Sequence, residues 1–165
     1  MTNGRTPGDG AARGSVTPGV ALIFATVGFL ALLIFGLGVV SLALDESIIE
    51  TPGLGPIPGV VATTTAIVVF AATLWAVVRR TEPSFWNAIW IAAAVFLGYL
   101  GGLWIAAILT GVPIGVATGV SGRIAMTWFG VVIAGTALVT AWAGIALVRT
   151  RARRPRWPWE PRGDE

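Results

Sequence analysis

The stretch VALIFATVGFLALLIFGLGVVSLAL, residues Val20–Leu44, contains no charged side chain. A helix of this length is about 37 Å long, which is enough to cross a hydrocarbon core about 30 Å thick with some tilt. A cleaved signal peptide is the alternative, because Arg5 and Arg13 precede the stretch and Ser41–Ala43 fits a small-residue cleavage site. However, the apolar core of a signal peptide is only roughly 7–15 residues long. We therefore expect Val20–Leu44 to be a retained transmembrane helix.

Three more apolar stretches follow, each long enough to cross a membrane. With the first one, they predict spans at about residues 20–44, 59–78, 86–109 and 124–148. The second is the weakest, because it contains the run Thr63–Thr65, and we expect it to depend on a neighbouring helix. The uncharged, glycine-rich segment Gly111–Gly122 is expected to be a loop that lies in the membrane interface or enters it. The fold class is therefore all-α: a polytopic membrane protein with a four-helix transmembrane bundle at residues 18–149.

The composition supports a lipid-facing surface. Hydrophobic residues make up 55% of the 165 and charged residues 12%, whereas a soluble domain has about 25% charged residues. Cysteine and histidine are absent, which excludes disulfides, thiolate ligands and bis-histidine haem within this chain. We therefore expect no metal site, no cofactor and no catalytic residue. Although the net charge is +3, the arginines cluster at the ends of apolar runs, so we expect no nucleic-acid partner.

The arginines fall almost entirely on one side of the expected spans. Arg123 lies alone on the other side, and the remaining ten of the 11 share the first side: Arg5, Arg13, Arg79, Arg80, Arg149, Arg151, Arg153, Arg154, Arg156 and Arg162. Cytoplasmic loops are enriched in basic residues, so we expect a multi-pass protein of the cell membrane with both termini in the cytoplasm. Residues 1–17 are expected to form a disordered cytoplasmic N-terminus, and residues 150–165 a basic cytoplasmic tail.

Cations and aromatic rings come together on the expected cytoplasmic side. An arginine near an anionic leaflet contributes about 1 kcal/mol, and tryptophan favours the membrane–water interface. We expect contact with anionic lipids of the inner leaflet from these residues: Arg79, Arg80, Arg149, Arg151, Arg153, Arg154, Arg156, Trp157 and Trp159. A partner-docking peptide, kept extended by the prolines of the tail, is the alternative.

A small residue recurs at every fourth position of the third span, namely Ala94, Gly98, Gly102 and Ala106. This spacing makes a flat stripe on one helix face, which lets two helix backbones approach closely. The stripe has two possible roles. It can pack inside the chain's own bundle, or it can dock to another membrane protein or a second copy of the chain. Trp90 and Trp104 lie deeper in the span than the other tryptophans, and we expect them to pack between helices.

Polar side chains inside the spans are few, and none of them is charged. This absence counts against an ion-coupled transporter, which needs an ionisable group in the membrane. Tyr99 could bond a quinone or lipid carbonyl, but we favour a packed ring whose hydroxyl bonds a threonine of a neighbouring helix. Asp45, Glu46 and Glu50 offer three carboxylates to a divalent cation, and such ions need about six oxygens. We therefore expect these carboxylates to be a solvated topology signal, with Arg123 on the same side.

Two short stretches and the four-span layout carry a resemblance to known sequences. The stretches are GLGPIPGVV at Gly53–Val61 and RPRWPWE at Arg154–Glu160. With them, the chain resembles an uncharacterised family of small four-helix membrane proteins from high-GC Gram-positive bacteria. The resemblance implies no activity for any residue.

The sequence favours a non-catalytic accessory or structural membrane protein that packs with itself or with a larger membrane complex. An enzyme is not expected, because the chain offers no nucleophile–base pair and no set of metal ligands. The alternative is a small transporter or channel component that acts as an oligomer. Its polar path would be lined by Thr63–Thr65, Tyr99, Thr136 and Thr140.

Overall fold

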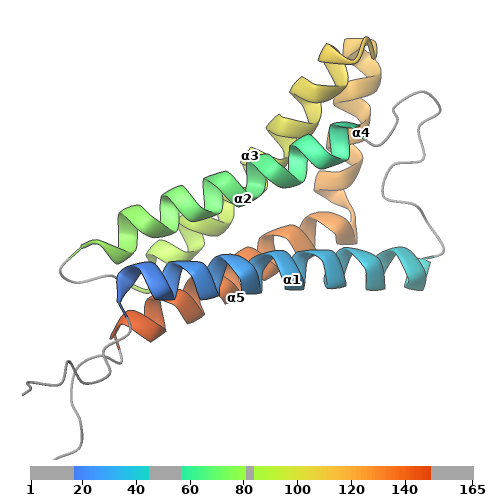
Figure 1. The fold of residues 1–165 in the computed structure, drawn as a ribbon. Helices are drawn as coiled ribbons and strands as arrows, with labels where there is room; N and C mark the ends of the chain where they lie inside the picture. Colours follow the sequence, from blue (N-terminus) through green and yellow to red (C-terminus); the bar gives the residue numbers. More distant parts are fainter. Residues whose placement is uncertain (1–16, 45–56, 81–83, 150–165) are drawn as a thin grey trace, which may run out of the picture.

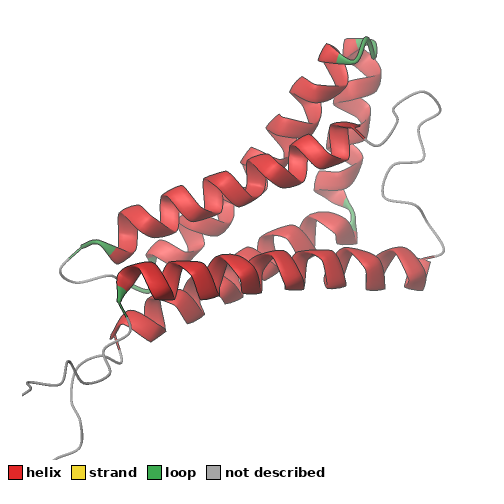
Figure 2. Ribbon diagram, in the orientation of Figure 1, coloured by secondary structure: helices red, strands yellow, loops and turns green. Residues whose placement is uncertain are grey.

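The computed structural model describes residues 17–44, 57–80 and 84–149. These residues form five helices: α1 (Pro18–Leu44), α2 (Ile57–Val78), α3 (Asn87–Leu109), α4 (Ile114–Met126) and α5 (Trp128–Arg149). In Figure 2 the described residues are helices and short turns, and this part of the chain contains no strand. The expected all-helical class is therefore confirmed.

Four of the five helices are long and apolar enough to cross a membrane. They are α1 over Pro18–Ala43, and α2, α3 and α5 over their whole lengths. The second helix begins at Ile57, slightly earlier than expected, and the last long helix begins at Trp128, later than the expected residue 124. The four long helices each contain 22 or more residues, so each is at least about 33 Å long.

The segment expected to be a glycine-rich loop is instead mostly helical, and this expectation was wrong. Helix α4 begins directly after Pro113, whose carbonyl accepts bonds from the N–H groups of Val116 and Ala117 at 2.9 and 3.0 Å. Each glycine in a helix costs about 1 kcal/mol relative to alanine, which is why the composition favoured a loop. Burial of Ala117 and Ile124 against neighbouring helices offsets that cost, as tertiary packing commonly does for short helices.

The turn from α3 into α4 depends on one glycine with a positive φ. Gly111 has φ +87°, which an L side chain rarely adopts. The N–H of Val112 bonds the Ala107 carbonyl and the N–H of Gly111 bonds the Ile108 carbonyl, each at 3.0 Å. This pair of bonds is a Schellman motif, which ends α3 and redirects the chain into α4.

A break separates α4 from α5, inside the stretch that was expected to start the fourth span. Thr127 has φ −101° and ψ 172°, so its backbone is extended. Behind it, a Cβ placed on Gly130 would lie 2.7 Å from the Ile124 carbonyl oxygen and 2.9 Å from that of Ala125. The first turn of α5 therefore packs directly on the last carbonyls of α4, and only a residue without a side chain fits there.

The long helices alternate in direction, so their connections fall at two opposite ends. Figure 1 shows the start of α1, the end of α2 and the end of α5 at one end of the molecule. The closest pairs are α2 with α3 and α1 with α5, and α3 and α5 join the two pairs. Helix α4 lies at the opposite end and runs crosswise to α1 and α5 (Figure 1).

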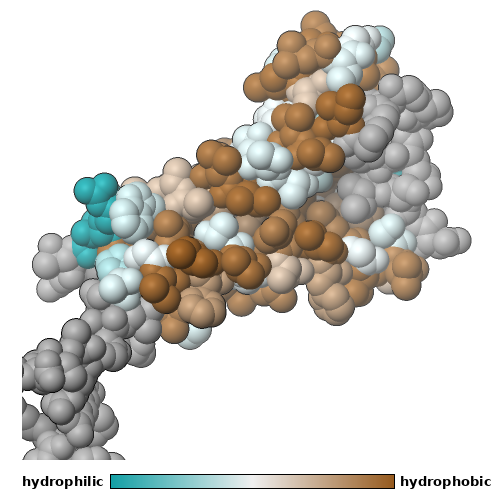
Figure 3. Space-filling model, in the orientation of Figure 1, coloured by the Kyte–Doolittle hydropathy of each residue, from teal (hydrophilic) through white to brown (hydrophobic). Residues whose placement is uncertain are grey.

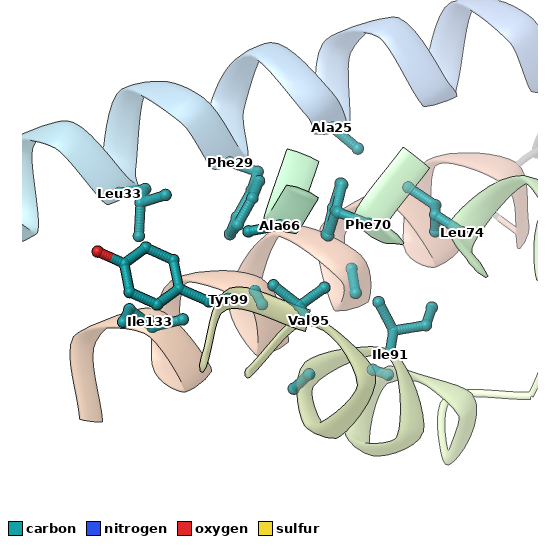
Figure 4. Packing of buried hydrophobic residues seen from close by; sticks show 14 of the residues in the cluster. Ala25, Phe29, Leu33, Ala66, Phe70, Leu74, Ile91, Val95, Tyr99 and Ile133 are labelled. Carbon is teal, nitrogen blue, oxygen red and sulfur yellow. The ribbon is translucent and has the colours of Figure 1, made fainter. Parts of the chain in front are cut away.

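One apolar core lies between the four long helices. Phe29 of α1 stacks on Phe70 of α2, with ring centroids 4.6 Å apart and planes 13° apart, and Figure 4 shows the two rings beside Ala66 and Val95. On α1 the buried residues recur at every fourth position: Ala21, Ala25, Phe29, Leu33 and Leu37. This spacing is that of the i±4 ridges, which interlock when two helices cross at an inclination. The α1 and α2 ribbons in Figure 1 are inclined in this way.

The outer surface of the helices is apolar as well. Phe24 and Phe35 on α1 are 68% and 69% exposed, and brown atoms predominate on the described part of the face in Figure 3. Soluble proteins rarely expose contiguous apolar surface of this extent. The outward faces therefore suit lipid.

Replacement of Phe70 by alanine should lower the free energy of unfolding by about 3 kcal/mol, because it leaves a cavity beside Phe29. The matched control is Phe35→Ala, which removes an exposed ring that meets detergent in both the folded and the unfolded state. We expect less than about 1 kcal/mol for the control. Unfolding of the purified protein by SDS in mixed micelles measures both values, and equal losses would contradict the assignment of Phe70 to the core.

Candidate functional site

A group of cations and rings surrounds the end of the molecule where α2 ends and α3 begins. Arg79 and Arg80 directly follow α2, Phe85 precedes α3, and Arg149 is the last residue of α5. Cations at helix C-termini interact favourably with the helix dipole, which helps to place them there. We call this group the cation–aromatic collar, and its members are Trp75, Arg79, Arg80, Phe85, Trp142 and Arg149.

Two cation–π contacts fix the collar's geometry. The Arg79 guanidinium carbon lies 5.6 Å from the centroid of the Trp75 ring, one helical turn earlier. The Arg149 guanidinium carbon lies 4.6 Å from the Phe85 ring, and Phe85 in turn packs against Trp142, with centroids 5.8 Å apart at 32°. Contacts of this kind contribute about 0.5–1 kcal/mol at exposed sites. They therefore favour positions of the Arg79 and Arg149 guanidinium groups beside the Trp75 and Phe85 rings.

The collar is open to its surroundings. Phe85 is 37% exposed and Trp142 is 55% exposed, and the arginines are exposed too. In Figure 3, hydrophilic atoms gather at the end where α2 ends, beside an apolar surface. Guanidinium groups beside exposed rings can bind anionic oxygens such as those of phosphate. The remaining expected lipid-contact residues, Arg151, Arg153, Arg154, Arg156, Trp157 and Trp159, lie outside the described residues.

The structure places the glycines of the small-residue stripe against α2 of the same chain. A Cβ on Gly102 would lie 2.8 Å from the Thr65 hydroxyl oxygen and 3.3 Å from the Ala62 Cα, and a Cβ on Gly98 would lie 3.1 Å from a Val69 methyl group. The stripe's outer members are Ala94, which is half-buried, and Ala106, which is buried. Of the two possibilities left open, the glycines therefore serve packing within the chain.

Two other glycines allow a similar approach between helices and were missed by the sequence analysis. A Cβ on Gly36 of α1 would lie 2.6 Å from a Val132 methyl group on α5. A Cβ on Gly144 of α5 would lie 3.0 Å from the Ala25 Cβ and 3.2 Å from a Leu74 methyl group. The residues four positions before and after Gly36 are Leu32 and Val40. Because neither is small, no four-residue repeat indicates the role of Gly36.

Four hydroxyls of the expected polar path donate to carbonyls of their own helices. Thr65 donates to the Val61 carbonyl and Thr64 to that of Val60, both at 2.8 Å. Thr136 and Thr140 donate at 2.7 Å to the carbonyls of Val132 and Thr136 in the preceding turn. Such bonds occupy the hydroxyl hydrogen within the helix, and the methyl groups remain for packing.

Tyr99 is a core residue with 2% exposure. Figure 4 shows its ring beside Leu33 and Ile133, with the hydroxyl directed away from the Phe29–Phe70 pair. The expected packing of the ring is observed. In the described part of the chain, the threonine hydroxyls donate mainly to carbonyls of their own helices.

Neither of the two deeper tryptophans is buried between helices as expected. Trp90 is 75% exposed, so the expectation that it packs between helices was wrong. Its position follows from the helix period, since Ile91 and Ala92 occupy the inward face next to it. Trp104 is 38% exposed and donates its Nε1–H to the Thr118 hydroxyl of α4 at 3.1 Å.

The acidic segment with Asp45, Glu46 and Glu50 lies outside the described residues. Within residues 17–44, 57–80 and 84–149, no group of three or more His, Cys, Asp or Glu side chains forms a possible metal site.

Comparison with known families gives a match over most of the chain. A family of unknown function (DUF6121) matches residues 17–165, so the chain belongs to this family. The expected membership of an uncharacterised family agrees with this finding, whereas the expected source in Gram-positive bacteria stays a prediction. Neither the curated proteins nor the solved structures contain a match.

Replacement of Gly102 by leucine should destabilise the fold by about 2 kcal/mol or more, because the new side chain collides with Thr65 and the α2 backbone. Gly101→Leu is the matched control, since a Cβ there meets no atom within 4 Å. We expect the control to be neutral or slightly stabilising, because leucine favours a helix more than glycine does. Thermal melting in detergent measures both variants, and wild-type melting of Gly102→Leu would contradict the close approach of α2 and α3.

Proposed function

We propose that this member of the DUF6121 family is a non-catalytic structural or accessory protein of the cell membrane. The observation that carries the proposal is the contrast between an interior used for packing and a cation–aromatic collar open to its surroundings. The four long apolar helices suit a transmembrane bundle, and their glycines and threonines serve contacts within the chain. This arrangement leaves the outer surface of the molecule as the place where it acts.

In this proposal the collar faces the cytoplasm. The basic residues that flank α2 and α5 lie at the same end of the molecule as the start of α1. Basic residues close to the ends of spans remain on the cytoplasmic side. Both termini are then cytoplasmic, and α4 is on the outer side of the membrane.

The collar is proposed to hold anionic lipids of the inner leaflet. Its rings prefer the depth of the headgroups, and the cation–π contacts keep Arg79 and Arg149 at that depth. Each arginine near an anionic leaflet contributes about 1 kcal/mol. Arg79, Arg80 and Arg149 together would then favour anionic over zwitterionic lipid by about 3 kcal/mol.

A small transporter or channel component, acting as an oligomer, is the alternative. It needs a continuous polar path, and four of the five threonines expected to line that path donate to carbonyls of their own helices. Purification from native membranes in mild detergent separates the two functions. A stoichiometric larger membrane partner supports the accessory role, whereas a symmetric homo-oligomer supports a pore and would argue against our proposal.

Single cysteines test the orientation, because the chain contains none. An impermeant maleimide should label Ser47→Cys on intact cells and Ser84→Cys only after permeabilisation. These positions flank α2 on its two sides in the sequence, so they report opposite faces of the membrane. The reverse labelling pattern would overturn the proposed orientation, and equal labelling of both on intact cells would overturn a spanning α2.

The collar is tested by lipid-dependent stability of the purified protein. Addition of phosphatidylglycerol should raise the melting temperature of the wild type more than phosphatidylcholine does. The triple variant Arg79→Gln, Arg80→Gln, Arg149→Gln should lose most of that difference, because its collar no longer attracts phosphate.

Arg123→Gln is the matched control for the collar variant, since Arg123 lies on α4 at the opposite end of the molecule. We expect the control to keep the full preference for phosphatidylglycerol. If the triple variant keeps it as well, the collar does not bind anionic lipid.

A further inference from the structure

We infer that α4 is an interfacial helix that lies along the outer membrane surface, with its exposed face in the headgroup region of the outer leaflet. The inference rests on the proposed function in one respect, because it assumes that the four long helices span the membrane. It assigns a partner, the outer-leaflet lipid, to a surface that the proposed function leaves unexplained.

The length and placement of α4 do not suit a fifth span. Its 13 residues make a helix about 20 Å long, which is too short for a hydrocarbon core of about 30 Å. It contacts both α3 and α5, and in Figure 1 it crosses the end of the molecule opposite the collar. A helix that connects the outer ends of two spans and runs crosswise to α1 and α5 lies close to the membrane plane.

Opposite faces of α4 meet different surroundings. Ala117 and Ile124 are 1% and 2% exposed and pack on the protein. Ile114 is 63% exposed and Met126 is 92% exposed, so apolar side chains at both ends of the helix point outward. Arg123 in the last turn has a long apolar stem, which lets its charge reach water from a helix embedded in the interface.

Two tryptophans support the placement of this level of the molecule at the membrane–water interface. Trp128 begins α5 next to the end of α4 and is 65% exposed. Trp104, near the end of α3, donates its ring N–H to Thr118 of α4 at 3.1 Å. Exposed tryptophans at the ends of spans are typical of the interfacial belt. The rings and α4 lie at one level, so lipid headgroups, and not bulk water, are expected to cover the helix.

Spin labels test this placement on the intact chain in proteoliposomes of phosphatidylcholine and phosphatidylglycerol. Single cysteines at Ile114→Cys, Gly119→Cys and Met126→Cys sample the length of α4. The first and third residues are exposed, and a Cβ on Gly119 meets no atom within 4 Å. Leu97→Cys, at an exposed position in the middle of α3, is the control for the hydrocarbon core.

The relative accessibility of each label to oxygen and to a polar nickel complex gives its depth. We expect similar, shallow depths at residues 114, 119 and 126 and a large depth at residue 97. A depth that changes by about 1.5 Å per residue along α4 would mean that the helix enters the membrane, and it would overturn the inference. Full nickel access with no oxygen preference would place α4 in water and would overturn it too.

Two further readouts separate α4 from the rest of the proposal. Dipolar broadening between labels on α4 would mean that a second copy of the chain covers its exposed face in place of lipid, which also overturns the inference. A shallow label at residue 97 would instead overturn the spanning arrangement itself. The outcome at residue 97 therefore shows whether the inference or the proposed function has failed.

Discussion

Helices in lipid gain little from the hydrophobic effect when they associate, because lipid tails are as apolar as their side chains. Stable association then depends on how closely the helix surfaces approach. In this chain the approach is made by glycines of three helices: Gly102 against Thr65 and Ala62, Gly36 against Val132, and Gly144 against Ala25 and Leu74. The two close pairs, α2 with α3 and α1 with α5, are each held by such a contact. The stacked rings of Phe29 and Phe70 then join one pair to the other.

The same constraint explains where the polar groups of the chain lie. Inside hydrocarbon an unpaired polar group is costly, and most threonines of α2 and α5 donate to carbonyls one turn back in their own helices. The buried hydroxyl of Thr26 on α1 is an exception, because it has no hydrogen-bond partner. Charged side chains of the described residues are confined to helix ends. Arg79, Arg80 and Arg149 occupy one end of the molecule, and Arg123 lies on the crosswise helix at the other. The two ends therefore differ chemically, and the described surface between them is largely apolar and carries no charged side chain.

The long helices were predictable from the sequence because a long uncharged apolar run has few other structures available to it. The glycines at 98 and 102 were predictable as well, since a four-residue repeat places them on one face. Gly36 carries no such signal, because its role depends on which helix lies opposite. The α4 helix was missed for a related reason: its glycines disfavour a helix locally, and only the burial of Ala117 and Ile124 against other elements compensates. Trp90 shows the same limit, since depth along a span does not determine which face a ring occupies.

The distribution of chemistry limits the kind of function that the fold can support. A transported solute or a reacting substrate needs donors, acceptors or charges along its route. Here the hydroxyls of Thr65, Thr136 and Thr140 donate to carbonyls of their own helices, and the core positions are filled mainly by rings and aliphatic groups. Tyr99 adds a single phenol to that core, beside Leu33 and Ile133. The groups left to interact are on the outside: apolar helix faces, the cation–aromatic collar and the exposed face of α4. In our proposal the protein therefore acts through what it touches in the membrane, and the asymmetry between its two ends determines which leaflet each group meets.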